Sequence, residues 1–219
     1  MENRRWGGCF LARWTTDWDC GYETGFWYVI KDSPYNIESL KAKRRYEITK
    51  GRRYYSVKII NPAEFQEDLF HVTTKAYEGW PKKYRPIVNK DSFYKTLEQW
   101  IGCDFFGAFN KSTGNLVAYA VLKDLSNCIL FSVLRADPSE EKNGINAAMV
   151  DGILQYYNDR FTGDFYICDG ARSIRHETAF QDYLEKYFGF RKVYCKLNIK
   201  YRGFFGLLIK ALAIPTRCC

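Results

Sequence analysis

The stretch DFYICDGARSIRHETAFQDYLEKYFGFRK, residues 164–192, decides the fold and places the candidate site. It opens with a short run, Phe165 to Cys168, whose aromatic and β-branched side chains predict a buried strand. Asp169-Gly170 is a turn signal that would end this strand. A helix is expected next, between a Thr178 cap and a Gly189 stop, because apolar residues recur every three or four positions: Phe180, Tyr183, Leu184 and Tyr187.

The loop between this strand and this helix gathers polar and titratable side chains. Arg172, Arg175, His176 and Glu177 all fall there. Ligands of α/β proteins bind beyond the carboxyl ends of the strands, so this loop is the leading candidate for a site. A well-capped corner between a strand and a helix would use the same residue types, and the sequence leaves that alternative open.

The composition is that of a folded, basic protein. Of the 219 residues, 47% are hydrophobic, which suits one compact domain with an N-terminal extension. Lys and Arg outnumber Asp and Glu by 33 to 25, a formal charge of +8. This balance favours anionic partners such as phosphates, nucleic acid or acidic lipid headgroups, although a solvated basic surface would give the same sum.

Cysteine and histidine usage argues against a metal site. The eight cysteines include no C-x-x-C pair, and the chain has only two histidines, His71 and His176. We therefore expect free thiols and no bound metal, as is usual in a reducing cytosol. No apolar run has the length of a signal peptide's core or of a membrane span, so a cytoplasmic protein is expected.

The most basic part of the chain lies between residues 36 and 53. Asn36 can cap a helix and Gly51 can stop it, which predicts a helix over residues 37–50. The cations of this segment are Lys41, Lys43, Arg44, Arg45, Lys50, Arg52 and Arg53. Such a helix either has a solvated face or contacts the phosphates of RNA or of membrane lipids.

The remaining elements follow from hydrophobic periodicity and from turn residues. Residues 1–30 are expected to form short strands or extended arms. Strands are predicted over residues 55–60, 105–109, 116–122, 128–134 and 191–201, and helices over residues 63–78, 91–101 and 144–157. From residue 55 onward the order is therefore β-α-α-β-β-β-α-β-α-β, which predicts an α/β fold with a mixed sheet.

That order resembles the fold of GNAT-type acyltransferases. In this family a Pro ends the fourth core strand, and a loop of the form [RQ]-x-x-G-x-[GA] begins the next helix; Pro138 and Gly144 match this spacing. The Gly-Phe pair that follows the family's fourth helix is similar to Gly189-Phe190. The resemblance covers residues 55–201 and implies a mixed, mostly antiparallel sheet flanked by helices. It also implies that a donor binds where two parallel strands part, after Leu134 and Cys168.

The resemblance assigns roles to the residues at the end of the fourth core strand. Backbone groups that polarise the donor carbonyl would come from Val133, Leu134 and Arg135. The pyrophosphate of acetyl-CoA, or of another acyl-CoA, would lie against Lys142, Asn143 and Gly144. Glu141 and Asn146 depart from the family pattern, and a glutamate in this loop would repel the phosphates.

The basic segment before residue 55 is similar to one in the Fem-type and exopolysaccharide-associated branch of this fold, where an R/K-rich helix precedes the core. Some members of that branch take an aminoacyl group from tRNA instead of an acyl group from coenzyme A. The departures at Glu141 and Asn146 suit that branch. Both donors stay open: an acyl-CoA or an aminoacyl-tRNA.

Catalysis in this family needs a base for the attacking amine and a proton donor for the leaving group. His176 is the candidate base, since an imidazole titrates at about pH 6.5; a hydrogen-bonded loop residue is the alternative. The family's proton donor is a tyrosine four residues before the Gly-Phe pair, where this chain has Glu185. Tyr183 is the candidate substitute, and an amphipathic core position is the alternative interpretation of this residue.

Substrate contacts are expected from two basic clusters. The loop between the first two core helices carries Lys82, Lys83, Tyr84 and Arg85, which would favour an anionic small-molecule or lipid-linked acceptor. Arg172 and Arg175 could bind a phosphate or carboxylate through two hydrogen bonds each. Solvated charge and surface salt bridges are the competing interpretations of both clusters.

The chain is expected to divide into an extension over residues 1–54, packed on a core over residues 55–201, and an apolar tail over residues 202–219. The tail is too short to span a bilayer and would either lie on a membrane surface or cover a sheet edge. The leading function is transfer of an acyl or aminoacyl group to an amine or hydroxyl acceptor in cell-envelope or surface-polysaccharide assembly, either in the cytoplasm or at the inner face of the membrane. The alternative is a non-catalytic module that binds RNA or a membrane surface through its basic helix.

Overall fold

The computed structural model describes residues 11–172 and 179–202. Its α-helices are α1 (Ala42–Tyr54), α2 (Gln66–Glu78), α3 (Lys90–Gln99), α4 (Ile145–Tyr156) and α5 (Ala179–Phe188). Its strands are β1 (Leu11–Thr16), β2 (Phe26–Lys31), β3 (Tyr55–Ile59), β4 (Asp104–Asn110), β5 (Leu116–Asp124), β6 (Cys128–Ala136), β7 (Tyr166–Ala171) and β8 (Arg191–Tyr201). The short 3-10 helices are η1 (Ile37–Ser39), η2 (Pro62–Glu64), η3 (Lys82–Tyr84), η4 (Pro138–Asn143) and η5 (Asn158–Arg160).

Hydrogen bonds order the eight strands as β1-β8-β2-β7-β6-β5-β4-β3. The pairs β1–β8, β3–β4, β4–β5 and β5–β6 are antiparallel, whereas β6 and β7 run parallel. From β3 to β8 the elements follow the predicted order β-α-α-β-β-β-α-β-α-β. The predicted α/β fold with a mixed, mostly antiparallel sheet is therefore confirmed.

The chain divides into two compact units, residues 29–192 and residues 1–28 with 193–219. In the smaller unit, β1 pairs with β8 from Leu11↔Tyr201 to Thr16↔Lys196. The Thr24 hydroxyl donates a 2.8 Å hydrogen bond to the carbonyl of Cys195 in the same unit. The expected boundaries at residues 54 and 201 stay a prediction.

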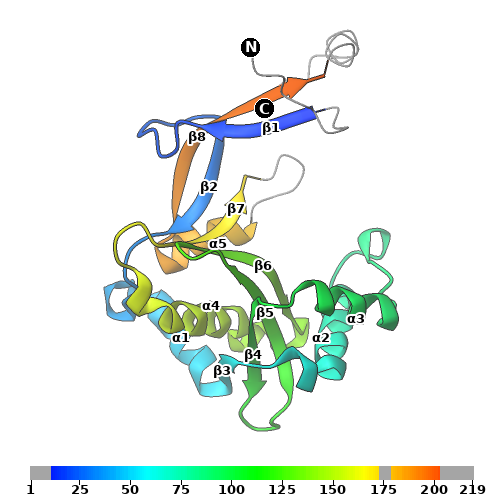
Figure 1. The fold of residues 1–219 in the computed structure, drawn as a ribbon. Coiled ribbons are helices and arrows are strands. Elements are labelled where there is room, and N and C mark those ends of the chain that lie inside the picture. Colours follow the sequence, from blue (N-terminus) through cyan, green and yellow to red (C-terminus); the bar gives the residue numbers. More distant parts are fainter. Residues whose placement is uncertain (1–10, 173–178, 203–219) are drawn as a thin grey trace. The chain divides into compact units, whose positions relative to one another are not determined.

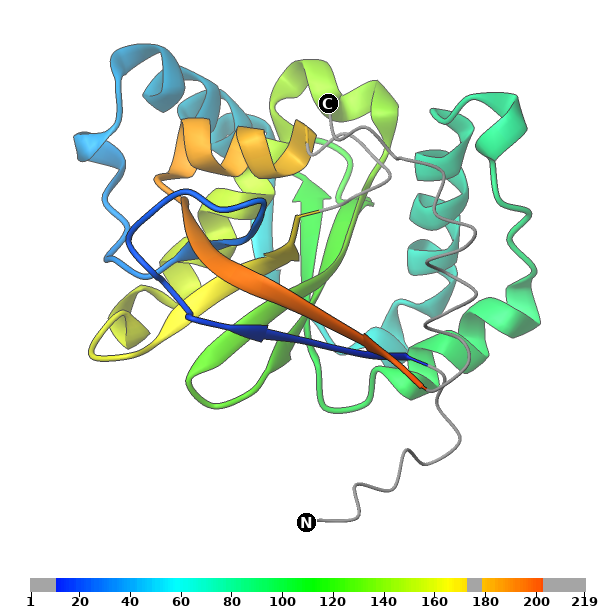
Figure 2. The same ribbon diagram turned by 90° about the horizontal axis from the view of Figure 1, so that it is seen from above.

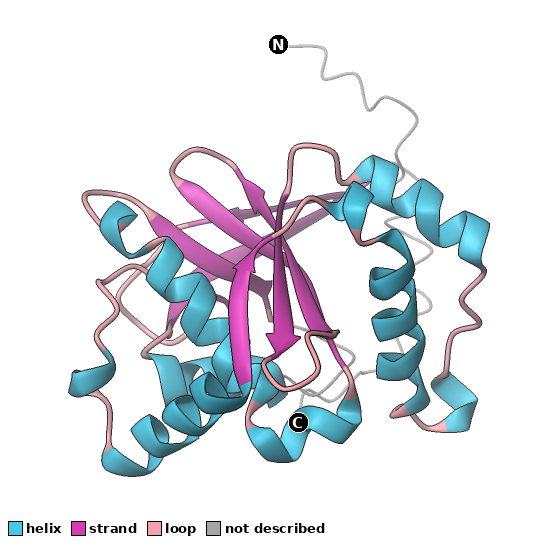
Figure 3. Cartoon of the chain, turned by 90° about the horizontal axis from the view of Figure 1, so that it is seen from below, coloured by secondary structure: helices cyan, strands magenta, loops and turns pink. Residues whose placement is uncertain are grey.

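Helices cover both faces of the sheet in the larger unit (Figure 1). Figure 2 shows α1, α4 and α5 on one side of the sheet and α2 with α3 on the other, and the same layers are seen from below in Figure 3. α2 packs on β5 and β6, while α4 packs on β3, β4 and β5. The core beneath α2 and α3 is built from Ile60, Leu69, Val72, Phe93, Leu97, Phe105, Leu116, Tyr119 and Val121.

The basic helix α1 continues past the residue that was expected to end it. Gly51 is buried inside the helix, and a Cβ added there would lie 2.6 Å from the Gly144 carbonyl oxygen at the start of α4. Gly51 is therefore needed for the close approach of two backbones, and its prediction as a helix stop was wrong. The helix ends three residues later at Tyr54.

A buried carboxylate also joins α1 to α4. Asp151 of α4, whose side chain is 4% exposed, accepts hydrogen bonds from Arg52 Nε at 2.7 Å and Arg52 Nη2 at 2.8 Å. The Tyr35 hydroxyl donates a third bond at 2.7 Å. This pairing neutralises the carboxylate and fixes one of the cations of the basic segment in a structural role.

No helix within residues 11–172 or 179–202 combines the length and the apolar character that crossing a bilayer requires.

Candidate functional site

The parallel strands β6 and β7 part soon after they begin. Their pairing runs from Cys128↔Tyr166 to Leu130↔Cys168 and no further, although β6 continues to Ala136 and β7 to Ala171. The separation was predicted after Cys168, and it occurs there; on β6 it begins at Leu130, four residues before the expected Leu134. Asp169-Gly170, expected to end the second strand, instead lies inside β7 and past the point of separation.

β6 keeps its other partner beyond this point. Its antiparallel register with β5 runs on to Ala118↔Ala136, with one irregularity between Val121↔Val133 and Leu122↔Phe131. Ser132 is the extra residue of this bulge, so the strand turns its side chains at that position. Over residues 131–136, β6 thus stays paired with β5 on one side and is no longer paired with β7 on the other.

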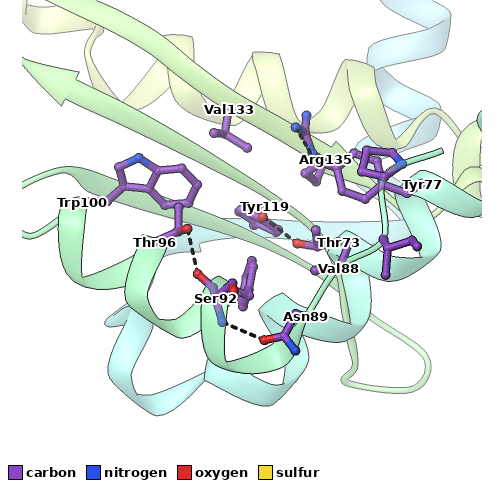
Figure 4. A pocket seen from close by; sticks show the side chains of 13 residues that line it. Thr73, Tyr77, Val88, Asn89, Ser92, Thr96, Trp100, Tyr119, Val133 and Arg135 are labelled. Carbon is purple, nitrogen blue, oxygen red and sulfur yellow. Dashed lines mark hydrogen bonds between the residues drawn. The ribbon is translucent and has the colours of Figure 1, made fainter. Parts of the chain in front are cut away.

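A cavity of about 320 Å³ lies against this unaccompanied part of β6 (Figure 4). Its polar lining residues are Thr73, Tyr77, Asn89, Ser92, Thr96, Tyr119 and Arg135. Its apolar lining residues are Pro86, Ile87, Val88, Phe93, Trp100 and Val133. Trp100 stands at one end and Arg135 with Tyr77 at the other, so the cavity has an aromatic end and a cationic end.

The cationic end is held in place by stacking and hydrogen bonds. The Arg135 guanidinium lies 5.1 Å from the centre of the Tyr77 ring, and its Nη2 donates to the Tyr77 hydroxyl at 3.1 Å. Its Nη1 donates to the Leu134 carbonyl at 3.0 Å. A half-buried, oriented guanidinium of this kind is suited to a carboxylate or a phosphate.

The floor of the cavity carries a buried hydroxyl pair. Thr73 Oγ1 and Tyr119 Oη lie 2.7 Å apart, and Thr73 also donates to the Leu69 carbonyl. Because Thr73 gives its proton to that carbonyl, the Tyr119 hydroxyl is the donor between the two. Burial raises the pKa of Tyr119 above its ordinary value, so this hydroxyl stays neutral.

Asp169 is the first residue of β7 beyond the separation, and sequence reasoning missed it. Burial raises the pKa of its carboxyl to about 7, against the smaller, lowering effect of a hydrogen bond from Gln181. Gln181, buried on α5, also donates from Nε2 to the carbonyls of Gly170 and Ala171 at 3.4 Å. Its Oε1 has no partner among the described residues, and a protonated Asp169 could supply one. The signal that could have found Asp169 is a carboxylate directly after the last buried residue of a strand.

Tyr183, the predicted proton donor, lies on α5 among aromatic rings. Its ring stacks on Phe180 at 6.1 Å and lies 4.9 Å from Tyr187. Burial, and next the charge of Glu47, raise its pKa. Phe180 in turn contacts Phe131 of β6 at 6.4 Å, so α5 covers the start of the unaccompanied segment. The catalytic role of Tyr183 stays a prediction.

The turn after β6 folds as a 3-10 helix, with Gly144 at φ +81° between η4 and α4. The Gly144 N–H, expected to be available to an anion, donates to the Glu141 carbonyl at 3.0 Å. Lys142 is exposed, and its carbonyl accepts a 2.6 Å hydrogen bond from Lys50 of α1. The side-chain amide of Asn143 donates from Nδ2 to the Glu140 carboxylate at 3.3 Å. Of the three residues predicted to hold a pyrophosphate, two thus use polar groups within their own turn.

The predicted acceptor residues Lys82, Lys83, Tyr84 and Arg85 are exposed on the loop between α2 and α3. They precede the segment from Pro86 to Asn89 that lines the cavity, so they border the cavity without facing into it. Arg172 is half-buried directly after β7. His176 and Arg175 lie outside the described residues, and their predicted roles stay predictions. Within the described ranges, no group of three or more side chains is arranged to bind a metal.

No protein-family profile matches the chain, and no curated protein matches it. Among solved structures, FemX superposes with a TM-score of 0.59 at 9% identity, covering 85% of this chain and 63% of that one. L-PGS from Bacillus licheniformis superposes with a TM-score of 0.55 at 12% identity, covering 94% and 66%. The C-terminal domain of a putative lysylphosphatidylglycerol synthetase from Agrobacterium fabrum gives 0.53 at 9% identity, covering 92% and 65%. The chain thus spans slightly less than two thirds of the length of these structures. Its element order, the parting of β6 from β7 and these superpositions agree: the chain has a GNAT-like fold.

Proposed function

We propose that the chain transfers an acyl or aminoacyl group to an amine or hydroxyl acceptor. The observation that carries this proposal is the separation of β6 from β7 after Leu130 and Cys168, beside a cavity lined by Val133 and Arg135 of the same β6 segment. A strand whose one side is left without a neighbour can offer N–H groups to a reacting carbonyl. The cavity can hold the acceptor within reach of that carbonyl.

The reaction needs a proton to move from the nucleophile to the leaving group. The acceptor nitrogen or oxygen bonds to the acyl carbon, and the bond from that carbon to the donor's oxygen or sulfur breaks. The proton lost by the acceptor goes to a base, with His176 the predicted candidate, and the leaving atom takes a proton from the protein. Asp169 suits the second role, since a carboxyl with a pKa of about 7 carries a proton in a useful fraction of molecules at neutral pH.

The acceptor and the leaving group would use opposite faces of the sheet. Val133 and Arg135 face the cavity under α2 and α3, whereas Asp169 interacts with Gln181 of α5. An arrangement of this kind lets the nucleophile approach from one side while the departing donor is protonated on the other.

We favour an aminoacyl-tRNA over coenzyme A as donor. The turn that would hold the pyrophosphate carries Glu140 and Glu141, and the Gly144 N–H is already bonded. A solved structure with a TM-score above 0.5 is called a putative lysylphosphatidylglycerol synthetase, a name that describes an aminoacyl group on a phospholipid. A comparable acceptor here would be an anionic, lipid-linked molecule of the cell envelope, with its negative charge at Arg135.

The exposed face of α1 favours an RNA ligand. Lys43 and Arg53 of α1 are exposed, as is Lys41 directly before the helix, and Tyr46 and Tyr54 are 65% and 42% exposed on the same helix. Cations interleaved with exposed aromatic rings bind phosphates and stack on unpaired bases. The same face supports a second candidate function, RNA binding without transfer.

The test is a donor screen with two kinds of readout. Purified chain is incubated with tRNA charged with labelled amino acids, or with acetyl-CoA, together with anionic phospholipids or nucleotide-linked sugars, and products are identified by mass spectrometry. Labelled acceptor that forms with the parent chain and forms more slowly with Arg135→Met, at an acceptor concentration below KM, supports the transferase. Salt-dependent tRNA binding with no product from any donor would instead establish the RNA-binding function.

A further inference from the structure

The loop between α2 and α3 exposes apolar side chains to an unusual degree. Ile87 is 98% exposed, Tyr84 is 64% exposed and Trp80 is 45% exposed. Single exposed apolar residues are common on protein surfaces, but three within eight positions of one loop form a local apolar surface. This loop lies at the outer side of the layer formed by α2 and α3 (Figure 3).

The backbone of this loop is ordered by two prolines and by hydrogen bonds. Pro81 and Pro86 restrict it at both ends, and the Tyr84 N–H donates to the Pro81 carbonyl at 2.8 Å to close η3. Arg85 donates from Nη2 to the carbonyls of Glu78 and Trp80, which fastens the loop to the end of α2. The apolar exposure therefore belongs to an ordered turn.

The charge of the loop is of one sign. Lys82, Lys83 and Arg85 lie in it, and no acidic residue occurs between Gly79 and Asn89. The nearest glutamate, Glu78, is paired with Lys75 at 3.0 Å. Lys82 and Lys83 are exposed beside the apolar side chains.

We propose that this loop docks on the surface of a bilayer that contains anionic lipids. Trp80 and Tyr84 have the amphipathic rings that settle at headgroup level, and Lys82 and Lys83 attract the lipid charge. Ile87 can enter the acyl-chain boundary. This aliphatic side chain distinguishes the loop from an RNA surface, because it offers neither a ring to stack on a base nor a hydrogen-bond donor.

Docking would bring the cavity to the membrane. Pro86, Ile87 and Val88 line the cavity as well as belonging to the loop, and Trp80 packs edge-on against Tyr77, the residue that holds Arg135, at 5.2 Å. A lipid-linked acceptor could then enter without leaving the bilayer. This last step rests on the proposed transfer function, whereas docking itself does not.

The test is co-sedimentation of the full chain with vesicles. Vesicles of phosphatidylglycerol and phosphatidylcholine should bind the protein, and vesicles of phosphatidylcholine alone should bind it much more weakly. Lys82→Gln with Lys83→Gln should weaken binding by roughly 30-fold, about 5-fold for each charge removed. Tyr84→Ser with Ile87→Ser should weaken it by at least about 10-fold. All four residues are exposed, so unchanged melting temperatures should accompany these losses.

Two matched variants serve as controls. Ile101→Ser removes an apolar side chain that is 85% exposed elsewhere, and Lys41→Gln with Lys43→Gln removes two exposed lysines at the start of α1. Both should bind vesicles as the parent chain does. The proposal is overturned if the loop variants bind like the parent chain, or if the α1 variant alone loses binding.

Vesicle binding and transfer are measured separately, so the two proposals can fail independently. A chain that transfers acyl groups without binding vesicles would refute docking and would still support the proposed transfer function. A parent chain that does not bind anionic vesicles but binds tRNA, with the loop variants losing tRNA binding, would identify the loop as an RNA surface and refute docking.

Discussion

Arg135 donates a 3.1 Å hydrogen bond to the hydroxyl of Tyr77, while its guanidinium lies 5.1 Å from the centre of the same ring. The two contacts use one aromatic residue of α2 to orient a cation on β6. The guanidinium therefore has a fixed direction at the end of the cavity before any ligand arrives. A pre-oriented charge loses less conformational entropy on binding than a free one.

Arg135→Met should raise the KM for an anionic acceptor by ~10-fold to 100-fold, because a hydrogen bond to a charged group contributes roughly 1.5–3 kcal/mol. kcat should change much less, since the proposed partners of the acyl carbonyl are backbone N–H groups of β6 and not this side chain. Tyr77→Phe keeps the ring and removes the hydroxyl, so it should have a smaller effect on KM. Steady-state kinetics with the acceptor identified in the donor screen makes the comparison, and equal KM values for the parent chain and Arg135→Met would contradict it.

Asp169→Asn should stabilise the protein at pH 8 and change little near pH 4. The folded-state pKa of about 7 lies above the ordinary value for aspartate, so the folded state binds more protons than the unfolded state between these values. The free energy of unfolding contributed by this group therefore falls as pH rises through that window, by at most a few kcal/mol in total. Urea unfolding at pH 4, 6 and 8 measures the difference between the two proteins.

The same substitution should lower kcat if Asp169 protonates the leaving group. An asparagine keeps the shape and loses the transferable proton, so the decrease should reach about 100-fold or more with KM nearly unchanged. An acceptable control is Asp182→Asn, an exposed carboxylate on α5. A variant that is more stable at pH 8 yet fully active would assign Asp169 a purely structural position.

Gly51→Ala should destabilise the protein although alanine favours helices. The added Cβ would lie 2.6 Å from the Gly144 carbonyl oxygen and 3.0 Å from the Ala148 Cβ. Forcing α1 and α4 apart should cost about 1–3 kcal/mol, more than the roughly 1 kcal/mol gained from helix propensity. Urea unfolding should show the loss, while Thr49→Ala, an exposed change on the same helix, should show none.

Arg52→Met should destabilise the chain, whereas Arg53→Met should not. Removing Arg52 leaves the Asp151 carboxylate, 4% exposed, with only neutral donors from Tyr35 and Gln155. Arg52 itself is 42% exposed, so the loss should be about 1–3 kcal/mol, less than for a fully buried pair. Arg53 is exposed and serves as the matched control. Equal urea midpoints for the two variants would show that Asp151 finds another partner.

The elements that local signals define were predictable. β8 spans Arg191 to Tyr201 as expected, because Gly189 adopts φ +69° and ends α5 where a left-handed residue is required. The basic helix was misjudged at Gly51, since whether a glycine ends a helix or admits a neighbouring backbone depends on α4, some ninety residues away. No local pattern contains that information.

The position of the candidate site was predictable, and so were two residues of the cavity, Val133 and Arg135, although they were named for their backbone groups. The separation after Cys168 was implied by the resemblance to GNAT-type acyltransferases. Asp169 escaped notice because Asp-Gly is a turn signal in isolation, whereas here β7 continues through both residues to Ala171. The cavity joins Tyr77, Trp100 and Arg135 from three separate elements, and side-chain packing alone brings them together.

The exposed flank of β6 has a consequence for self-association. Strands that end a sheet attract other chains and are a common origin of aggregates. β6 instead lies between β5 and β7 in the strand order, so it is an interior strand of the sheet. Another chain would therefore reach the backbone of residues 131–136 only between two strands of the same sheet.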